Sequence, residues 1–223
     1  MLLLREGWKS NHKRVYRWYK LAGLSLRLKS VKKRRSVPRV PLPPARAPNE
    51  RWSRDFVADR LVDGRRFRLL ALVANFSRVS PALEADRWLT GERVVTVVER
   101  LARSGRKPKS LPVENGPEFL RKALDAWAYR NGVKLDFSRP GKPTDNAYIA
   151  SFNGKLRTEC LDQHWFLSLQ EAQETLETWR KEYNTDRPHT ALGRKTPEAF
   201  VEDWKRQQSA VPPVLQAVQQ ALD

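Results

Sequence analysis

Residues 111–150 read LPVENGPEFLRKALDAWAYRNGVKLDFSRPGKPTDNAYIA. The stretch begins as a short apolar strand that runs into a turn signal, Asn-Gly-Pro, at 115–117. An amphipathic helical pattern follows, and the apolar residues of 133–137 then alternate as they do in a strand. A Pro-Gly-Lys-Pro loop leads into a second helical segment that contains Ala150. This order predicts strand, helix, strand and helix.

The flanking sequence extends the same α/β pattern in both directions. Three strands are expected before residue 90, the first two joined by a turn at Asp63-Gly64. Three antiparallel strands followed by alternating helices and strands predict an α/β fold with one mixed sheet flanked by helices. The expected strands are 52–60, 66–75, 78–84, 109–114 and 133–137, and the expected helices outside 111–150 are 91–104, 167–183 and 197–206.

The net charge of +18 points to a polyanionic partner. The first 49 residues hold 14 Lys and Arg against one acid, so they contribute +13 of that charge. Cys160 is the only cysteine, which excludes an internal disulfide framework and suits a reducing cytosol. No apolar run approaches the roughly 18 residues of a membrane span. We therefore expect a cytoplasmic, nucleoid-associated protein with DNA as its partner and no membrane contact.

Composition divides the chain into four segments. Residues 1–28 form a basic segment, expected to be helical over 6–29, and 29–50 form a basic, Pro-rich linker. The catalytic core is expected at 51–206, and a Gln-rich tail at 207–223. Such a basic arm contacts phosphates without reading bases. Its predicted DNA contacts are Lys13, Arg14, Arg17, Lys32, Lys33, Arg34 and Arg35.

Several ordered strings resemble the integrase-type transposases of bacterial insertion sequences, which are relatives of the retroviral integrases. The resemblance runs from about Glu6 to Phe200 and implies a ribonuclease-H-like fold with a five-stranded mixed sheet and a basic helical N-terminal arm. It also implies that the chain begins inside the family's N-terminal DNA-binding module. The matching strings are Trp52-Ser-Arg-Asp55-Phe56, Asn115-Gly-Pro-Glu-Phe119, Pro140-Gly-Lys-Pro143, Asn146-Ala-Tyr-Ile-Ala-Ser-Phe-Asn-Gly154, Arg157-Thr-Glu-Cys160, and Tyr183-Asn184 with Arg187-Pro-His189.

The resemblance implies a catalytic centre in which two aspartates and a glutamate surround two Mg²⁺ ions. Asp55 stands at the first position, Glu114 at the second aspartate, and Ala150 at the glutamate, with the family's spacing of 35 residues between the last two. Glu114 is one methylene longer than aspartate, which displaces its carboxylate by about 1.5 Å. A preorganised site tolerates about 0.5 Å. Ala150 has no ligand atom, so Asp55 and Glu114 remain as the expected Mg²⁺ ligands.

Two acids near Ala150 are candidates for a replacement ligand. On a helix of about 100° per residue, Asp145 and Glu159 lie roughly 140° and 180° away from Ala150, so neither replaces the missing carboxylate. His189 lacks the Cys and His spacing of a zinc site. Further DNA contacts are expected in and near the last helix of the catalytic stretch, at Lys142, Asn153, Lys155 and Arg157.

Three functions remain open from the sequence. The first is a transposase polypeptide that folds and binds DNA but is catalytically impaired, and the second is an active transposase with an altered metal site. The third is a DNA-bound regulator that inhibits active transposase through mixed assemblies. Homo-oligomers are also expected. Metal-dependent strand transfer separates the second function from the others.

Overall fold

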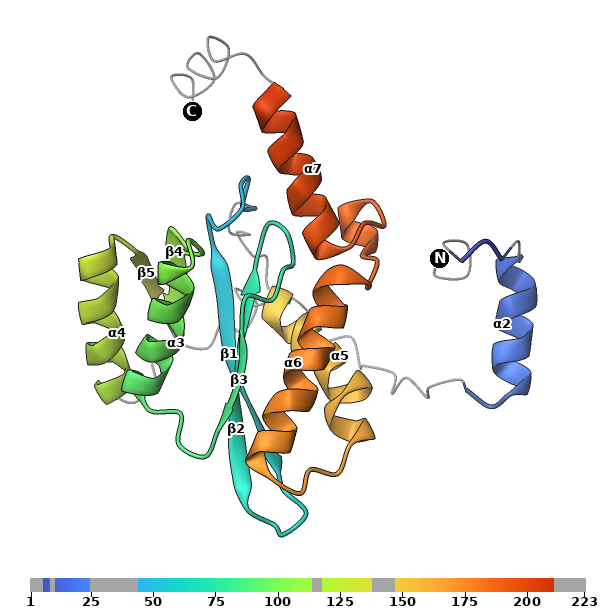
Figure 1. The fold of residues 1–223 in the computed structure, drawn as a ribbon, viewed down its shortest axis with the longest axis horizontal. Helices are drawn as coiled ribbons and strands as arrows, with labels where there is room; N and C mark the ends of the chain where they lie inside the picture. The colour runs from blue at the N-terminus through green and yellow to red at the C-terminus, as the bar shows by residue number, and fades with distance from the viewer. Residues whose placement is uncertain (1–5, 9–10, 25–43, 114–117, 138–146, 211–223) are drawn as a thin grey trace, which may run out of the picture. The chain divides into compact units, whose positions relative to one another are not determined.

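The computed structural model describes residues 6–8, 11–24, 44–113, 118–137 and 147–210. The chain divides into two compact units, 1–41 and 42–223, which are described separately (Figure 1). None of the helices in the described segments is long and apolar enough to cross a bilayer.

The N-terminal unit contains one described helix, α2 (His12–Leu21). Asn11 caps it, because its side chain accepts a hydrogen bond from the Lys13 backbone N–H at 2.9 Å. Gly23 follows at a φ of +67°, a left-handed conformation that ends the helix. The prediction of one helix over 6–29 is wrong in extent, since residues 6–8 lie outside any helix. No residue of α2 is buried within the described chain.

The larger unit is organised on an antiparallel sheet of three strands, in the order β1-β2-β3. Its strands are β1 (Trp52–Arg60), β2 (Arg66–Ala74) and β3 (Leu83–Asp86). The β1–β2 hairpin turns at Gly64, whose φ of +83° suits glycine. The register pairs Asp55 with Ala71.

The third strand begins later than predicted. The sequence predicts a strand over 78–84, whereas β3 spans Leu83–Asp86. The chain turns after β2 because Arg78 adopts a φ of +64° and its N–H bonds the Ala74 carbonyl at 2.8 Å. Asn184, 104 residues away, then accepts the N–H of Ser80 at 2.8 Å. Residues 78–82 are therefore held by a turn, by the Asn184 side chain and by two backbone hydrogen bonds from the end of β2, outside a regular strand.

Two parallel strands, β4 (Ser110–Val113) and β5 (Lys134–Phe137), continue the architecture. A parallel bridge between Arg51 and Ser110 joins β4 to the chain that enters β1. Strands β3-β2-β1-β4-β5 therefore lie side by side in a five-stranded mixed arrangement, which agrees with the predicted sheet.

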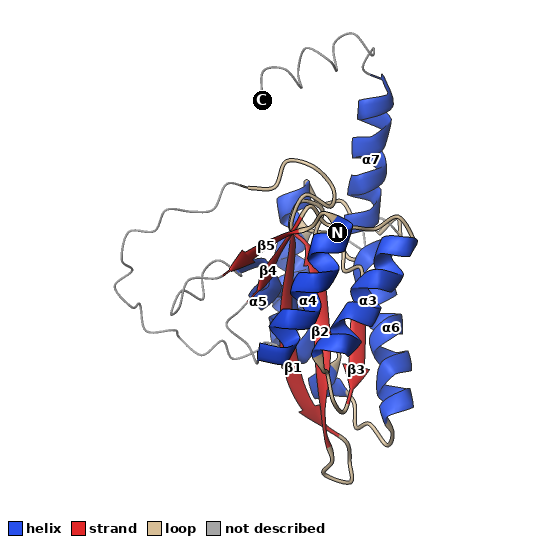
Figure 2. Ribbon diagram, turned by 90° about the vertical axis from the view of Figure 1, so that its left-hand side faces the viewer, coloured by secondary structure: helices blue, strands red, loops and turns tan. Residues whose placement is uncertain are grey.

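Helices cover both faces of this arrangement (Figure 2). On β2, Leu70, Leu72 and Ala74 belong to a core shared with α3 and α4, whereas alternate residues belong to a core shared with α5 and α6. This alternation is the two-residue period of a strand buried on both faces. The helices are α3 (Gly91–Arg103), α4 (Glu118–Asn131), α5 (Ala147–Glu159), α6 (Leu169–Thr185) and α7 (Pro197–Ala210), with 3₁₀ turns η2 (Leu161–Gln163) and η3 (Thr190–Leu192).

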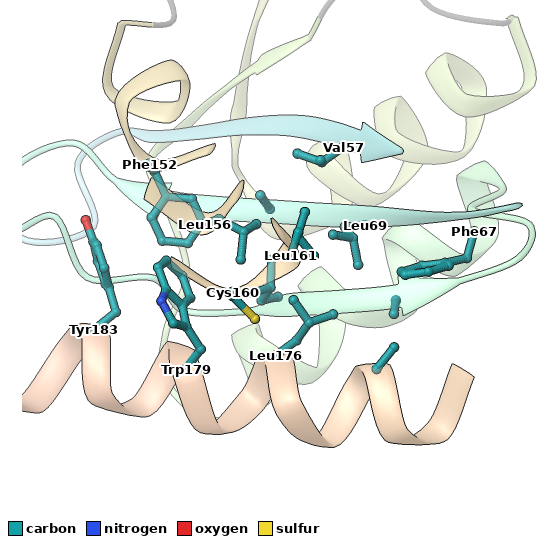
Figure 3. Close-up of a cluster of buried hydrophobic side chains, with 14 of the residues drawn as sticks. Val57, Phe67, Leu69, Phe152, Leu156, Cys160, Leu161, Leu176, Trp179 and Tyr183 are labelled. Carbon is teal, nitrogen blue, oxygen red and sulfur yellow. The ribbon is translucent and has the colours of Figure 1, made fainter. Parts of the chain in front are cut away.

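An aromatic cluster fixes α5 against α6 (Figure 3). The ring of Phe152 meets Trp179 at 5.4 Å and Tyr183 at 4.9 Å between centroids, both in edge-to-face geometry. Such pairs contribute about 0.5–1.5 kcal/mol beyond the area they bury. The cluster determines which flanks of α5 face outward.

Candidate functional site

Asp55 lies in the middle of β1 and is half-buried. Its Oδ1 accepts the backbone N–H of Phe56 at 2.8 Å. The neighbouring Arg54 is buried, and its Nε donates to the Pro112 carbonyl at 3.1 Å. The end of β4 therefore lies beside Asp55, two residues before position 114. Glu114 itself lies outside the described residues, so its predicted place next to Asp55 stays a prediction.

Asn153 of α5 connects that helix to Asp55. Its Nδ2 donates to Asp55 Oδ2 at 2.8 Å, between residues 98 positions apart. Ile149, Phe152 and Leu156 bury the inner side of α5 and so turn Asn153 toward β1. The sequence predicts Asn153 as a DNA contact, and in the fold its amide N–H orients the Asp55 carboxylate.

Ala150 is exposed on the flank of α5 that carries Asn153. Residues three apart on a helix are neighbours, so the Ala150 methyl group lies one turn before the amide that reaches Asp55. A glutamate side chain at position 150 would be attached to the same flank of α5. Ala150 therefore shares the flank of α5 that reaches Asp55 through Asn153, and an alanine supplies no oxygen on it.

The described residues do not fit a two-ion centre. No group of three His, Cys, Asp or Glu side chains within them could hold a metal ion. Both oxygens of Asp55 already accept hydrogen bonds, from Phe56 and Asn153. The Asn153 Oδ1 is buried without a hydrogen-bond partner in the described chain, but one amide oxygen does not replace two carboxylates.

The predicted DNA contacts fall into separate groups. Arg157 is exposed on the Asn153 flank of α5, and its Nη2 donates to the Ala58 carbonyl at 3.3 Å. Lys155 lies on the other flank, because two residues correspond to about 200° of helix rotation from Asn153. On α2, Lys13, Arg14 and Arg17 are exposed. Lys32, Lys33, Arg34, Arg35 and Lys142 lie outside the described residues.

Two further cations, for which the sequence predicts no role, lie beside Lys155. Arg78 follows β2, and its guanidinium lies 3.8 Å from the centroid of the Tyr148 ring. Arg187 follows α6 and forms an ion pair with Glu159 at the end of α5. Arg187 belongs to the Arg-Pro-His string quoted above, but only the folded chain brings it beside Arg78.

Comparison with known proteins agrees with this geometry. Residues 45–143 and 131–197 each match an integrase core domain family. The chain is 45% identical over 199 residues to the "Insertion element IS407 uncharacterized 31.7 kDa protein" of Burkholderia multivorans, covering 89% of this chain and 72% of that protein. It is 41% identical over 213 residues to the "Insertion element IS476 uncharacterized 39.2 kDa protein" of Xanthomonas euvesicatoria, covering 94% of this chain and 62% of that protein.

Solved structures give the same fold. A simian T-cell lymphotropic virus intasome, in complex with a PP2A regulatory subunit, contains a chain that matches with a TM-score of 0.65 at 16% identity, covering 82% of this chain and 62% of that one. The HTLV-2 integrase catalytic core domain in complex with magnesium matches with a TM-score of 0.56 at 16% identity, covering 70% of this chain and 97% of that one.

The fold is that of a ribonuclease-H-like integrase core, which confirms the expected fold class. With relatives above 40% identity over most of its length, the chain belongs to the integrase-core transposase family of bacterial insertion sequences.

Proposed function

We propose that this chain is a DNA-binding member of the transposase family whose two-metal catalytic centre is disabled. The observation that carries the proposal is Ala150, which is exposed one turn before Asn153, the residue that reaches Asp55. Phosphoryl transfer by two metal ions needs ligands that clamp both the attacking and the leaving oxygen. A methyl group at this position supplies none.

Magnesium is the family's expected ion, and Asp55 and Glu114 are the ligands that we propose remain here. Mg²⁺ demands near-octahedral oxygen coordination at about 2.0–2.1 Å, so a displaced carboxylate costs affinity directly. Asp55 offers one carboxylate, oriented by Asn153. We infer that this centre binds Mg²⁺ weakly and does not hold two ions at once.

DNA is the partner that the charge distribution supports. The first 49 residues carry +13 of the net +18, and four cations of this arm lie exposed on α2. Arg157 adds an exposed cation on the same flank of α5 as Asn153, and it contacts β1 at the Ala58 carbonyl. The viral relatives are an intasome and a trimeric catalytic core, which supports self-association of this chain or its assembly with an active transposase.

A strand-transfer assay on matched element ends tests the catalytic part of this proposal. We expect no product from the unmodified chain, from Glu114→Asp or from Ala150→Glu, and metal-dependent product from the double variant. Loss of one element of electrostatic stabilisation costs about 10²–10³ in rate, and defects within one site act as a unit. Each single restoration should therefore recover little activity.

An active relative assayed on the same DNA ends is the positive control. Robust Mg²⁺-dependent strand transfer by the unmodified chain, abolished by Asp55→Ala, would contradict the proposal and identify an enzyme with an altered metal site. If the chain is inactive but suppresses transfer by the active relative in mixtures, it acts as a regulator.

A further inference from the structure

A second concave site lies on the flank of α5 that faces away from Asp55. It is a pocket of about 460 Å³ between α5, the end of α6 and the chain that follows β2. Its charged lining consists of Arg78, Lys155 and Arg187, with the buried ring of His189 in its wall. We call these four residues the cation pocket. The three cations come from sequence positions up to 109 residues apart, so only the fold assembles them.

Two of the three cations are held in place by neighbours. Arg78 has a left-handed backbone, with a φ of +64°, a conformation uncommon for a residue with a side chain. Its guanidinium stacks on Tyr148 and donates to the Asn75 carbonyl. Arg187 is fixed by its ion pair with Glu159. The pocket therefore presents guanidinium groups whose positions are set before any ligand arrives, which reduces the entropy cost of binding.

Lys155 differs from the two arginines in its surroundings. No hydrogen bond or ion pair joins its Nζ to another residue of the described chain. Its burial lowers the pKa of the ammonium group, and the positive charges of Arg187 and Arg78 lower it further, while Glu159 alone opposes them. Three cations thus face one carboxylate, and the pocket holds a surplus of positive charge.

His189 contributes a buried nitrogen that has no hydrogen-bond partner in the described chain. The residue is 8% exposed, and the nitrogen is its Nε2. Leaving a buried polar atom without a partner is unfavourable, so this nitrogen is suited to a ligand group. An ion-pair network built only for stability would instead pair Lys155 and satisfy His189.

A phosphate group matches this chemistry. Guanidinium and ammonium groups donate to phosphate oxygens through charge-assisted hydrogen bonds, and arginine can do so with two parallel bonds. The pocket volume lies within the range of about 300–1,000 Å³ typical of ligand sites. A helix of about 10–12 Å diameter separates it from Asp55, so one DNA molecule can reach both flanks of α5.

We propose that the cation pocket binds a backbone phosphate of DNA, as a contact separate from the Asp55 centre. The proposal rests on the proposed DNA-binding function and adds a specific anchoring point to it. On duplex DNA, each phosphate that a protein neutralises contributes about 0.9 to the slope of log affinity against log salt. A phosphate bound in the pocket positions the DNA and does not read its sequence.

The test measures DNA affinity across a salt series for the full chain and three variants. Lys155→Gln should lower the slope by up to about 0.9, and combining it with Arg78→Gln should not lower it by more than that, because the pocket neutralises one phosphate. Arg66→Gln is the matched control. Arg66 is an exposed cation on β2, about 23 Å from the cation pocket when measured along the strand. It should leave the slope unchanged. Near-ultraviolet circular dichroism checks that each variant keeps the native fold.

Inorganic phosphate is the second probe. At equal ionic strength, phosphate should raise the thermal midpoint of the unmodified chain relative to chloride, and Lys155→Gln should remove that gain. DNA binding with an unchanged slope in Lys155→Gln would overturn the proposal while leaving the proposed function intact. If phosphate protects the chain but the slope does not change, the pocket takes a free anion and the DNA assignment is wrong. A chain that binds no DNA at all refutes the proposed function itself.

Discussion

Burial sets the chemistry of single side chains on the α5–α6 side of the sheet. It raises the pKa of the Cys160 thiol to about 11 and that of the Tyr183 hydroxyl to about 12. Burial also lowers the pKa of His189 to about 4, with additional repulsion from Lys155, Arg187 and Arg78. All three groups are therefore uncharged at neutral pH, as packing in a core requires.

The lowered pKa of His189 predicts how the free energy of unfolding depends on pH. His189 has a pKa of about 4 in the folded chain, below the 6.5 of an ordinary histidine, so the unfolded chain binds the proton more readily between these values. Stability from this group is complete above about pH 6.5 and is lost as the pH falls toward 4, by roughly 2–3 kcal/mol. Urea unfolding between pH 4 and 7.5 should show a steeper loss for the unmodified chain than for His189→Asn.

The exposed His12 on α2 provides the control for this measurement. His12→Asn should leave the pH dependence as it is in the unmodified chain. Equal pH slopes for His189→Asn and the unmodified chain would contradict the account of His189.

At the scale of elements, α5 has three separate sides. One flank carries Ala150, Asn153 and Arg157 toward Asp55, and the other carries Lys155 into the cation pocket. Between them, an apolar stripe seats the helix on the sheet and on α6. The geometry of both flanks consequently depends on the packing of that stripe.

Phe152→Ala tests this dependence. Phe152 is 1% exposed and contacts Trp179 and Tyr183, so its truncation should destabilise the chain by about 3–5 kcal/mol. Tyr129→Ala is the matched control, because Tyr129 is an aromatic residue that is 90% exposed on α4. Its cost should stay within about 0.5 kcal/mol. A destabilisation below about 1 kcal/mol for Phe152→Ala, measured by urea unfolding, would mean that the stripe does not hold α5.

Helices and strands could be predicted from the sequence where their apolar residues repeat at regular spacing within the element itself. The stripes of α3 and α6 follow from helical spacing, and on α3 they bury Val94, Val97 and Leu101. The start of β3 was not predictable, because the left-handed turn at Arg78 and the bond from Ser80 to Asn184 depend on distant chain. For the same reason, the sequence placed Lys155 and Asn153 together as DNA contacts although they lie on opposite flanks of α5.

At the scale of the whole molecule, the positive charge is concentrated in the N-terminal arm. The resemblance predicts Asp55 as a catalytic position, and its hydrogen-bond partner Asn153 emerged only from the fold, across 98 residues. The division of the chain at 28, 50 and 206 stays a prediction. The role of the arm in DNA binding also stays a prediction. It can be tested by removing the positive charges of the arm without deleting any residue.

Neutralising the arm should weaken the salt dependence of DNA binding. Each cation that contacts a duplex phosphate contributes about 0.9 to the slope of log affinity against log salt. The slope should fall by several units in a variant with glutamine at seven positions, and an unchanged slope would exclude the arm from the interface. A matched variant that neutralises cations of the core should change the slope little, provided that these cations lie outside the cation pocket and outside the Arg157 flank of α5. The seven positions are Lys13, Arg14, Arg17, Lys32, Lys33, Arg34 and Arg35.

The central claim is that Asp55, Glu114 and Ala150 do not form a two-ion centre. Calorimetric titration with Mg²⁺ and with Mn²⁺ tests it directly, because the measurement needs no knowledge of the DNA ends. The variant with both Glu114→Asp and Ala150→Glu should gain saturable binding that Asp55→Ala removes, since it restores carboxylates suited to these ions. We predict that the unmodified chain shows no saturable binding of two ions per chain. Binding of two ions by the unmodified chain, abolished by Asp55→Ala, would contradict the claim.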